Sequence, residues 1–361
     1  MKVRGMKLNG SLMSKDIKVA DIRNGIVFPV SEELLPIHFI NKGDIISWLE
    51  SRAIDMHRTN SRLLKKVLRL TTADDIEVVL KVKAATITDT YWVKPEGCEL
   101  TYDDIRFKEN MFDKLALHGD PDSFNNGHSQ YHTPELTNIG SFEKCWSIID
   151  GEWWMYKQGS EYELFSELFI CELGKALGFN MAHYELDGKF IRSRDFTNGA
   201  SVNYEPAFGI VGKEDDYSVN YEALKKLSER CAADYIKMIY LDTLCFNMDR
   251  HTNNYGVLRN ADEVIGLAPN FDNNIALISR GYLKNIKREN DFLIRLFVEF
   301  LGRSRDAYAA FSDMDIPLID LAMVESCVDR VPIKADRKYV REFILNGQEQ
   351  LAAATRRLQK S

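Results

Sequence analysis

The sequence predicts an α+β protein in which a sheet-bearing lobe precedes a helical lobe, with a further mixed α/β unit at the N-terminus. Between residues 140 and 196, short apolar runs alternate with Asp-Gly pairs, which is typical of antiparallel hairpins. From Asn220 onward, the apolar residues recur at helical spacing instead. We therefore expect three units, which are 1–130, of a role that the sequence does not indicate, 131–198, the sheet-bearing lobe, and 199–361, the helical lobe.

Length and composition are those of an ordinary soluble globular protein. The chain has 361 residues, of which 45% are hydrophobic and 28% charged, which is enough to build a large core in two or three packed units. Its net charge of −7 disfavours a direct nucleic-acid binder, which needs a basic face. The apolar runs are too short to span a bilayer, and none of signal-peptide length follows Met1. The six cysteines form no Cys-x-x-Cys pair. We expect a cytoplasmic protein without membrane contact.

The N-terminal unit is expected to contain short strands followed by a helix. The segment Ile17–Val30 alternates around Asn24-Gly25, which predicts two strands and a turn. The segment Ile45–Arg58 has helical periodicity, and Asp44 stands in the N-cap position. Residues 109–138 are rich in Asp, Asn, His, Gly and Pro. They predict a long surface connection at the domain boundary.

A tight hairpin is predicted after this connection. The runs Lys144–Ile149 and Glu152–Lys157 flank Asp150-Gly151, the residue pair that a type I′ turn prefers. A two-residue turn determines the register and places Lys144 opposite Lys157. Because like charges opposite each other are unfavourable, either an anion lies near the two lysines or both point into water. The residues leave both alternatives open.

A helix and a second hairpin complete the sheet-bearing lobe. The segment Tyr162–Leu177 has a broad apolar side, and Gly178 follows as a C-terminal stop. The runs Tyr184–Leu186 and Lys189–Ile191 flank Asp187-Gly188, which predicts another turn. The lobe should therefore hold a small antiparallel sheet with one helix.

A polar segment with the sequence NMDRHTNN follows a helix with an apolar face and precedes two short strands. Asp249 lies in this segment, Asn254 comes five positions later, and Asp272 follows the second strand. Because a hairpin returns the chain to its origin, we expect the three side chains to converge. Carboxylate and amide oxygens are ligands for Mg²⁺, and a carboxylate can orient a hydroxyl and accept its proton. The spacing therefore predicts a site for phosphoryl transfer from a magnesium nucleotide.

The motif Asp-Arg-His-x-x-Asn at 249–254, followed by a strand hairpin and Pro-x-Phe-Asp at 269–272, resembles the catalytic and metal-binding segments of HipA-like serine/threonine kinases. Phosphoinositide kinases share the first motif but have Asp-Phe-Gly at the second position, which this chain lacks. The resemblance implies a bilobal protein-kinase-like fold with ATP and Mg²⁺ as cofactors. It also implies that Asp249 is the catalytic base and that Asn254 and Asp272 are metal ligands.

The resemblance extends upstream to residues that bind the nucleotide. The segment Gly140-Ser141-Phe142-Glu143-Lys144 is similar to the phosphate loop of the family. It implies phosphate contacts for Gly140, Ser141 and Lys144. Lys157 matches the nucleotide lysine of the family, and Glu167 matches the helix acid that pairs with this lysine. Glu163, one turn earlier, is the rival for that pairing.

Other residues take supporting roles in the same resemblance. Arg194 and Phe196 fall where the hinge of the family meets adenine. Arg250 and His251 are expected to hold the loop rather than to take part in the chemistry. Members of the family can phosphorylate themselves in the phosphate loop, where this chain has Thr137 and Ser141.

We therefore predict a kinase that transfers the γ-phosphoryl group of Mg-ATP to a Ser, Thr or Tyr hydroxyl, with a protein as the expected acceptor. One alternative is a small-molecule or phosphoinositide-type kinase. The other is a pseudokinase or binding module, which is disfavoured by the intact set of Lys157, Glu167, Asp249, Asn254 and Asp272. In the family, the N-terminal domain contacts a DNA-binding antitoxin. An antitoxin-like partner would fall to residues 1–130, which match no motif of that domain.

Overall fold

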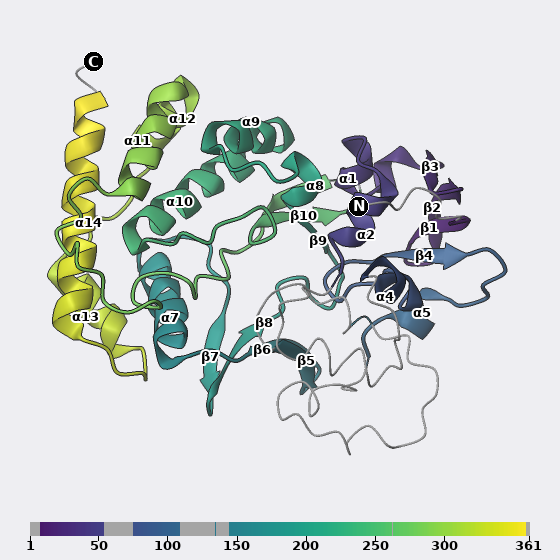
Figure 1. The fold of residues 1–361 in the computed structure, drawn as a ribbon, viewed down its shortest axis with the longest axis horizontal. Helices are drawn as coiled ribbons and strands as arrows, with labels where there is room; N and C mark the ends of the chain where they lie inside the picture. Colours follow the sequence, from purple (N-terminus) through teal and green to yellow (C-terminus); the bar gives the residue numbers. More distant parts are fainter. Residues whose placement is uncertain (1–7, 54–74, 109–133, 135–143, 262, 359–361) are drawn as a thin grey trace. The chain divides into compact units, whose positions relative to one another are not determined.

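The structure is a computed structural model, and it describes residues 8–53, 75–108, 134, 144–261 and 263–358. They form a mixed fold of three sheets and a set of helices, which confirms the predicted α+β class (Figure 1). The chain divides into two compact units. The first comprises Met1–Gln158, Arg192–Ile210 and Leu258–Ile265, and the second comprises Gly159–Ile191, Val211–Val257 and Gly266–Ser361. The connection predicted at 109–138 lies outside the described residues, apart from Pro134.

The first unit contains a four-stranded antiparallel sheet in the order β3-β2-β1-β4. Its strands are β1 (Gly10–Ser14), β2 (Ile17–Arg23), β3 (Ile26–Pro29) and β4 (Tyr91–Pro95). The turn between β2 and β3 has positive φ at both Asn24 (49°) and Gly25 (76°), as a type I′ turn requires. The two strands and the turn predicted for Ile17–Val30 are therefore confirmed.

Short helices cover this sheet. They are η1 (Glu32–Leu34), α1 (Ile37–Ile40), α2 (Ile45–Glu50), α4 (Asp75–Lys81) and α5 (Tyr102–Ile105). The prediction that one helix continues from Ile45 to Arg58 is wrong, because α2 ends at Glu50 and a turn follows. The Arg52 side chain turns inward there and pairs with the buried Asp89 carboxylate at 2.6 Å. A buried ion pair thus overrides the helical periodicity of the sequence.

Asp44 begins α2 as predicted, since its carboxylate accepts hydrogen bonds from the N–H groups of Ile46 and Ser47 at 2.9 and 3.0 Å. We expect Asp44→Ala to destabilise α2 by about 1 kcal/mol near neutral pH. Partial burial raises the pKa of Asp44, but the bonds from Ser47 and Ile46 outweigh it and lower the pKa below the ordinary value.

A carboxyl group whose pKa is lowered by folding stabilises the folded state above its unfolded pKa, and this contribution is lost as pH falls through the folded pKa. The difference between wild type and Asp44→Ala should therefore shrink below about pH 4. Hydrogen exchange of the α2 amides measures both effects. A difference that stays constant down to pH 2 would contradict the capping role.

The predicted tight hairpin is present residue for residue, as β5 (Lys144–Ile149) and β6 (Glu152–Lys157). Asp150 and Gly151 form its turn, and the register places Lys144 opposite Lys157. These strands continue into a sheet in the order β5-β6-β8-β7, with β7 at Tyr184–Asp187 and β8 at Phe190–Arg194. The second hairpin turns at Gly188-Lys189 rather than at Asp187-Gly188, because Gly188 supplies the positive φ of 60° and Asp187 stays in the strand.

The third sheet has the order β11-β10-β9. Its strands are β9 (Asn203–Pro206), β10 (Gly256–Asn260) and β11 (Glu263–Leu267). The two short strands predicted between Asn254 and Asp272 therefore exist, as β10 and β11. They follow the polar NMDRHTNN segment, as the sequence predicts.

The second unit is mainly helical. Its helices are α7 (Glu161–Ala176), α9 (Tyr217–Leu227), α10 (Glu229–Cys245), α11 (Phe292–Arg303), α12 (Arg305–Ser312), α13 (Leu321–Asp329) and α14 (Arg337–Leu358). The short α8 (Phe208–Val211) falls at the division between the two units, with all but Val211 in the first. Helix α10 packs against α7, α9, α11, α12 and α14, so it is buried on nearly all sides (Figure 1). A central, immobilised helix is a firm support for the polar segment at its C-terminal end.

Two further expectations can be compared with the described residues. No helix among them is long and apolar enough to cross a membrane. All six cysteines are free, and five of them are buried. Burial raises the pKa of Cys171, Cys231 and Cys327 to about 11 in each case, so these thiols stay protonated at neutral pH. They act as small apolar side chains.

Candidate active site

The polar segment begins where α10 ends. Phe246 adopts a left-handed conformation with φ 56° and closes the helix, and its N–H group and that of Asn247 donate to the Asp242 carbonyl. The Asn247 side chain then turns back, donates to the Asp242 carboxylate at 2.8 Å and accepts from the Asp249 N–H at 3.1 Å. The end of α10 therefore determines the position of Asp249.

Asp249 and Asn254 are in direct contact. The Asp249 carbonyl accepts hydrogen bonds from the His251 N–H and from the Asn254 Nδ2, both at 3.0 Å. The backbone polar groups of Asp249 are thus used within the loop, whereas its half-buried carboxylate has no hydrogen-bond partner among the residues that the structure describes. Since the amide nitrogen of the buried Asn254 is engaged, its Oδ1 is the atom left to bind a cation.

Arg250 ties this loop to the segment around Asp272. Its Nε and Nη2 donate to the two carboxylate oxygens of Asp242 at 2.8 and 2.9 Å. Its Nη1 donates to the carbonyls of Asn254 and Phe271 at 2.7 and 2.8 Å. Nη2 also reaches the side-chain oxygens of Asn270 and Asn273. One guanidinium therefore holds the loop after α10 and the chain on both sides of Asp272, which agrees with the expected loop-holding role of Arg250.

The Arg250–Asp242 pair is buried, with side chains 3% and 2% exposed. Burial alone would lower the pKa of Arg250, but the Asp242 carboxylate outweighs it and raises the pKa above the ordinary value, with smaller contributions from Asp272 and Glu167. Arg250 is therefore a permanent cation among three carboxylates, and its bidentate pairing with Asp242 is the strong form of this interaction.

Asp272 has a left-handed backbone with φ 60°. For a residue other than glycine this conformation costs about 1–2 kcal/mol, so its neighbours must hold it. Its N–H donates to the Tyr184 hydroxyl at 3.1 Å, and the next N–H, of Asn273, donates to Glu167 Oε1 at 2.7 Å. Each such bond contributes about 1 kcal/mol, and more where the acceptor is charged, which is enough to offset the cost.

Glu167 and its rival Glu163 have different surroundings. Glu163 forms a capping box with Ser160 at the start of α7, where the Ser160 N–H donates to the Glu163 carboxylate at 2.7 Å. Glu167 is fully buried and reaches the Asp272 segment. The capping role occupies Glu163, and Glu167 is the one of the two acids that contacts the Asp272 segment. Its pairing with Lys157 stays a prediction.

Tyr184 is a residue of the site that the sequence does not reveal. It begins β7, and in the sequence it is one aromatic residue in a short strand. Two causes raise the pKa of Tyr184 well above its ordinary value, namely burial, which has the larger effect, and the nearby Glu167 carboxylate. The hydroxyl therefore stays protonated. Only the packing of β7 beside the Asp272 segment shows its role.

The remaining predicted nucleotide residues lie in the first unit or outside the described residues. Lys144 and Lys157 are 8% and 5% exposed, so the alternative in which both point into water is wrong. Arg194 is exposed and pairs with Glu152 on β6. Phe196 packs edge-to-face on Tyr204 with ring centroids 5.6 Å apart. Gly140 and Ser141 lie outside the described residues.

The oxygen donors of the second unit suit Mg²⁺ better than they suit a metal ion whose ligands all come from protein side chains. Within the described ranges there is no group of three or more His, Cys, Asp or Glu residues that could hold a metal ion. Mg²⁺ needs only one or two protein oxygens, because phosphate oxygens and water complete its octahedral shell. Asn254 Oδ1 and the Asp272 carboxylate supply that number. These two residues would hold the ion.

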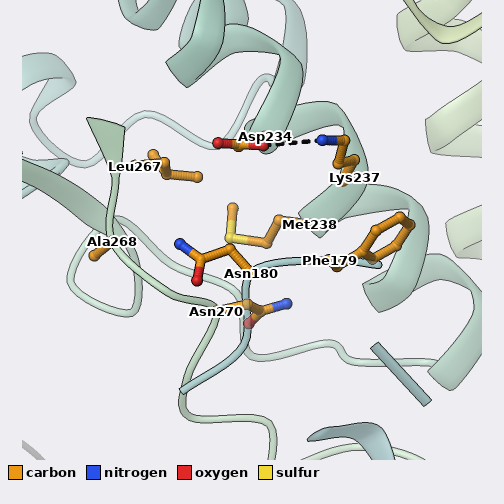
Figure 2. Close-up of a pocket in the computed structure, with 8 residues that line it drawn as sticks. All are labelled: Phe179, Asn180, Asp234, Lys237, Met238, Leu267, Ala268 and Asn270. Carbon is orange, nitrogen blue, oxygen red and sulfur yellow. Dashed lines mark hydrogen bonds and ion pairs between the residues drawn. The ribbon is translucent and has the colours of Figure 1, made fainter. Parts of the chain in front are cut away.

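A small hollow adjoins the site within the second unit. It is lined by Phe179, Asn180, Asp234, Lys237, Met238, Leu267, Ala268 and Asn270 (Figure 2). None of Asp249, Asn254 and Asp272 lines it. The Asn270 N–H donates to the Asn180 carbonyl at 2.8 Å, and its carbonyl accepts from the Ala182 N–H at 3.0 Å. The hollow therefore marks where the segment between β11 and Asp272 is anchored to residues 180–182.

Comparison with known proteins identifies solved structures of similar fold. The sequence matches no known family profile and no curated protein. Among solved structures, the chain is similar to HipA of Shewanella oneidensis MR-1, which was determined in a toxin–antitoxin complex with HipB and operator DNA. The match covers 98% of this chain and 99% of the HipA chain, with a TM-score of 0.56 and 12% sequence identity. The chain is also similar to the Helicobacter pylori proinflammatory kinase CtkA. This match covers 60% of this chain and 94% of the CtkA chain, with a TM-score of 0.43 and 18% sequence identity.

The chain therefore has a mixed α/β fold. More particularly, this fold is similar to that of HipA over nearly its whole length. The resemblance read from the Asp-Arg-His-x-x-Asn and Pro-x-Phe-Asp motifs is confirmed at the level of the fold.

Proposed function

We propose that this chain is a Mg-ATP-dependent, HipA-like protein kinase that phosphorylates a Ser or Thr hydroxyl, with Tyr within its range. One observation carries the proposal. The half-buried Asp249 carboxylate has no hydrogen-bond partner among the described residues, and Asp249 is bonded directly to Asn254. Arg250 ties this loop to the segment that carries the second Mg²⁺-type donor, Asp272. The HipA fold supports it independently.

In the proposed reaction, each residue has a separate task. Asp249 orients the acceptor hydroxyl and receives its proton as the new P–O bond forms. The bond between the γ-phosphorus and the β–γ bridging oxygen breaks in the same step, and ADP leaves. Asn254 and Asp272 would hold the magnesium ion, which neutralises charge on the β- and γ-phosphates when it is bound. Lys157 and Lys144, both buried on one face of the β5–β6 hairpin, would contact the phosphates. Buried cations interact more strongly with phosphate than cations in water do.

The proposal also covers location and partners. We place the protein in the cytoplasm, with a protein as the acceptor of the phosphoryl group. The HipA structure contains HipB and operator DNA, so an antitoxin-like partner is proposed by that likeness alone. Residues 1–130 are the part of the chain that would meet it.

The direct test is transfer of label from γ-labelled ATP in the presence of Mg²⁺, to the protein itself and to a peptide panel. We expect acid-stable label in wild type and a loss of about a hundredfold or more in Asp272→Ala, which removes an anionic metal ligand. Asp315→Ala changes an exposed carboxylate between α12 and α13 and should transfer label as wild type does.

Three outcomes would replace the proposal. Equal transfer by wild type and Asp272→Ala would reject the metal-ligand assignment. Label on a lipid or a small molecule, and on no peptide, would indicate the small-molecule or phosphoinositide-type kinase. Binding of ATP without transfer to any acceptor would indicate a pseudokinase or binding module.

A further inference from the structure

We propose that the Tyr184 hydroxyl is a positioning group that holds Asp272 in its left-handed conformation and thereby sets the affinity of the site for Mg²⁺. The inference rests on the proposed function, because it takes Asp272 as a metal ligand. It adds a residue that lies on β7, outside every motif of the resemblance.

The backbone on each side of Asp272 is held by a different side chain. The peptide group between Phe271 and Asp272 is bonded at both ends, since its carbonyl accepts from Arg250 at 2.8 Å and its N–H donates to the Tyr184 hydroxyl at 3.1 Å. The N–H of the next peptide group, at Asn273, donates to Glu167 Oε1 at 2.7 Å. The first peptide plane sets φ of Asp272 and the second sets ψ. Together the three side chains therefore define the direction in which the carboxylate leaves the backbone.

Tyr184 is the member of this set whose role can be isolated. Arg250 and Glu167 are buried charges, so removing either leaves other charges without compensation. The tyrosine hydroxyl is neutral, and Tyr184→Phe removes one oxygen while the ring keeps its place in the core. Without that acceptor, the peptide group before Asp272 can rotate away from the left-handed region, which an aspartate otherwise avoids.

The test measures Mn²⁺ binding in the presence of a non-hydrolysable ATP analogue. The electron spin resonance signal of free Mn²⁺ gives the unbound concentration at each step of the titration. We expect Tyr184→Phe to bind Mn²⁺ about fivefold more weakly than wild type, as the loss of one ordinary hydrogen bond implies. In the transfer assay, the Mg²⁺ concentration for half-maximal rate should rise by the same factor, and saturating Mg²⁺ should restore the wild-type kcat.

Tyr339→Phe is the matched control. Tyr339 lies in the same unit and has the same 8% exposure as Tyr184, and its hydroxyl accepts the Leu283 N–H at 2.7 Å. This hydroxyl also donates to the Leu283 carbonyl at 3.3 Å. The control variant therefore loses the same chemical group and at least as many hydrogen bonds, away from Asp272. It should bind Mn²⁺ as wild type does. Protection of the Asp272 amide from hydrogen exchange in wild type, measured against that of Leu283, tests the bond itself without any variant.

The outcomes separate this inference from the proposed function. Unchanged Mn²⁺ binding by Tyr184→Phe would overturn the inference, and so would an equal loss in Tyr339→Phe, since both would then act through general loosening. Wild type that binds Mn²⁺ with the nucleotide but transfers no phosphate would overturn the proposed function and leave the positioning test valid. Wild type that binds no Mn²⁺ would overturn both.

Discussion

Asp249→Asn should lower the rate of phosphoryl transfer by about 10²–10⁴-fold while nucleotide affinity stays within about twofold of wild type. Asparagine has the shape of aspartate but cannot accept the proton of the acceptor hydroxyl. The hydrogen bonds that hold this position use its backbone N–H and carbonyl, which the substitution retains. The free energy of unfolding should therefore change by less than about 0.5 kcal/mol.

Single-turnover transfer at saturating Mg-ATP measures the chemical step directly. Asp313→Asn makes the same change from carboxylate to amide at the exposed residue after α12, and should leave both rate and stability unchanged. If Asp249→Asn retains more than a tenth of the wild-type rate while binding ATP normally, Asp249 is not the base. A loss of rate that tracks a loss of folded protein would also reject the assignment.

The parts of the site that sequence predicts well are those determined by local structure. A two-residue turn defines the register of β5 and β6, so the Lys144–Lys157 pairing follows from the Asp150-Gly151 turn alone. Asp249 and Asn254 are close in the chain, and one loop hydrogen bond joins them. In both cases the residues that matter lie within a few positions of one another, where spacing constrains geometry.

Contacts between segments that are distant in the sequence could not be predicted from hydrophobic periodicity or motif spacing. Tyr184 lies 88 positions before the Asp272 N–H that it accepts, and Glu167 lies 106 positions before the Asn273 N–H. Arg52 likewise ends α2 early, because its partner Asp89 comes from a different segment. The energy of a buried polar group depends on the partner that tertiary packing brings to it. Helical or strand periodicity in the sequence does not indicate which residue that partner is.

Removing the carboxylate of Asp242 should have the largest effect on stability. We expect Asp242→Ala to lower the free energy of unfolding of the second unit by about 3–5 kcal/mol, because it leaves the Arg250 cation buried without its bidentate partner. Urea unfolding measures the change. The control is Asp329→Ala, which breaks the Arg337–Asp329 pair, whose side chains are 63% and 61% exposed. That loss should be within about 1 kcal/mol, since water already screens the pair.

The double variant Asp242→Ala with Arg250→Met separates the two roles of this pair. Removing both buried charges should recover much of the stability lost in Asp242→Ala, because no uncompensated cation remains. Activity should not recover, since the carbonyls of Asn254 and Phe271 lose the guanidinium that holds the loop and the Asp272 segment together. Recovery of both stability and transfer would mean that Arg250 only balances charge. Recovery of stability alone would identify it as the residue that brings the two halves of the site together.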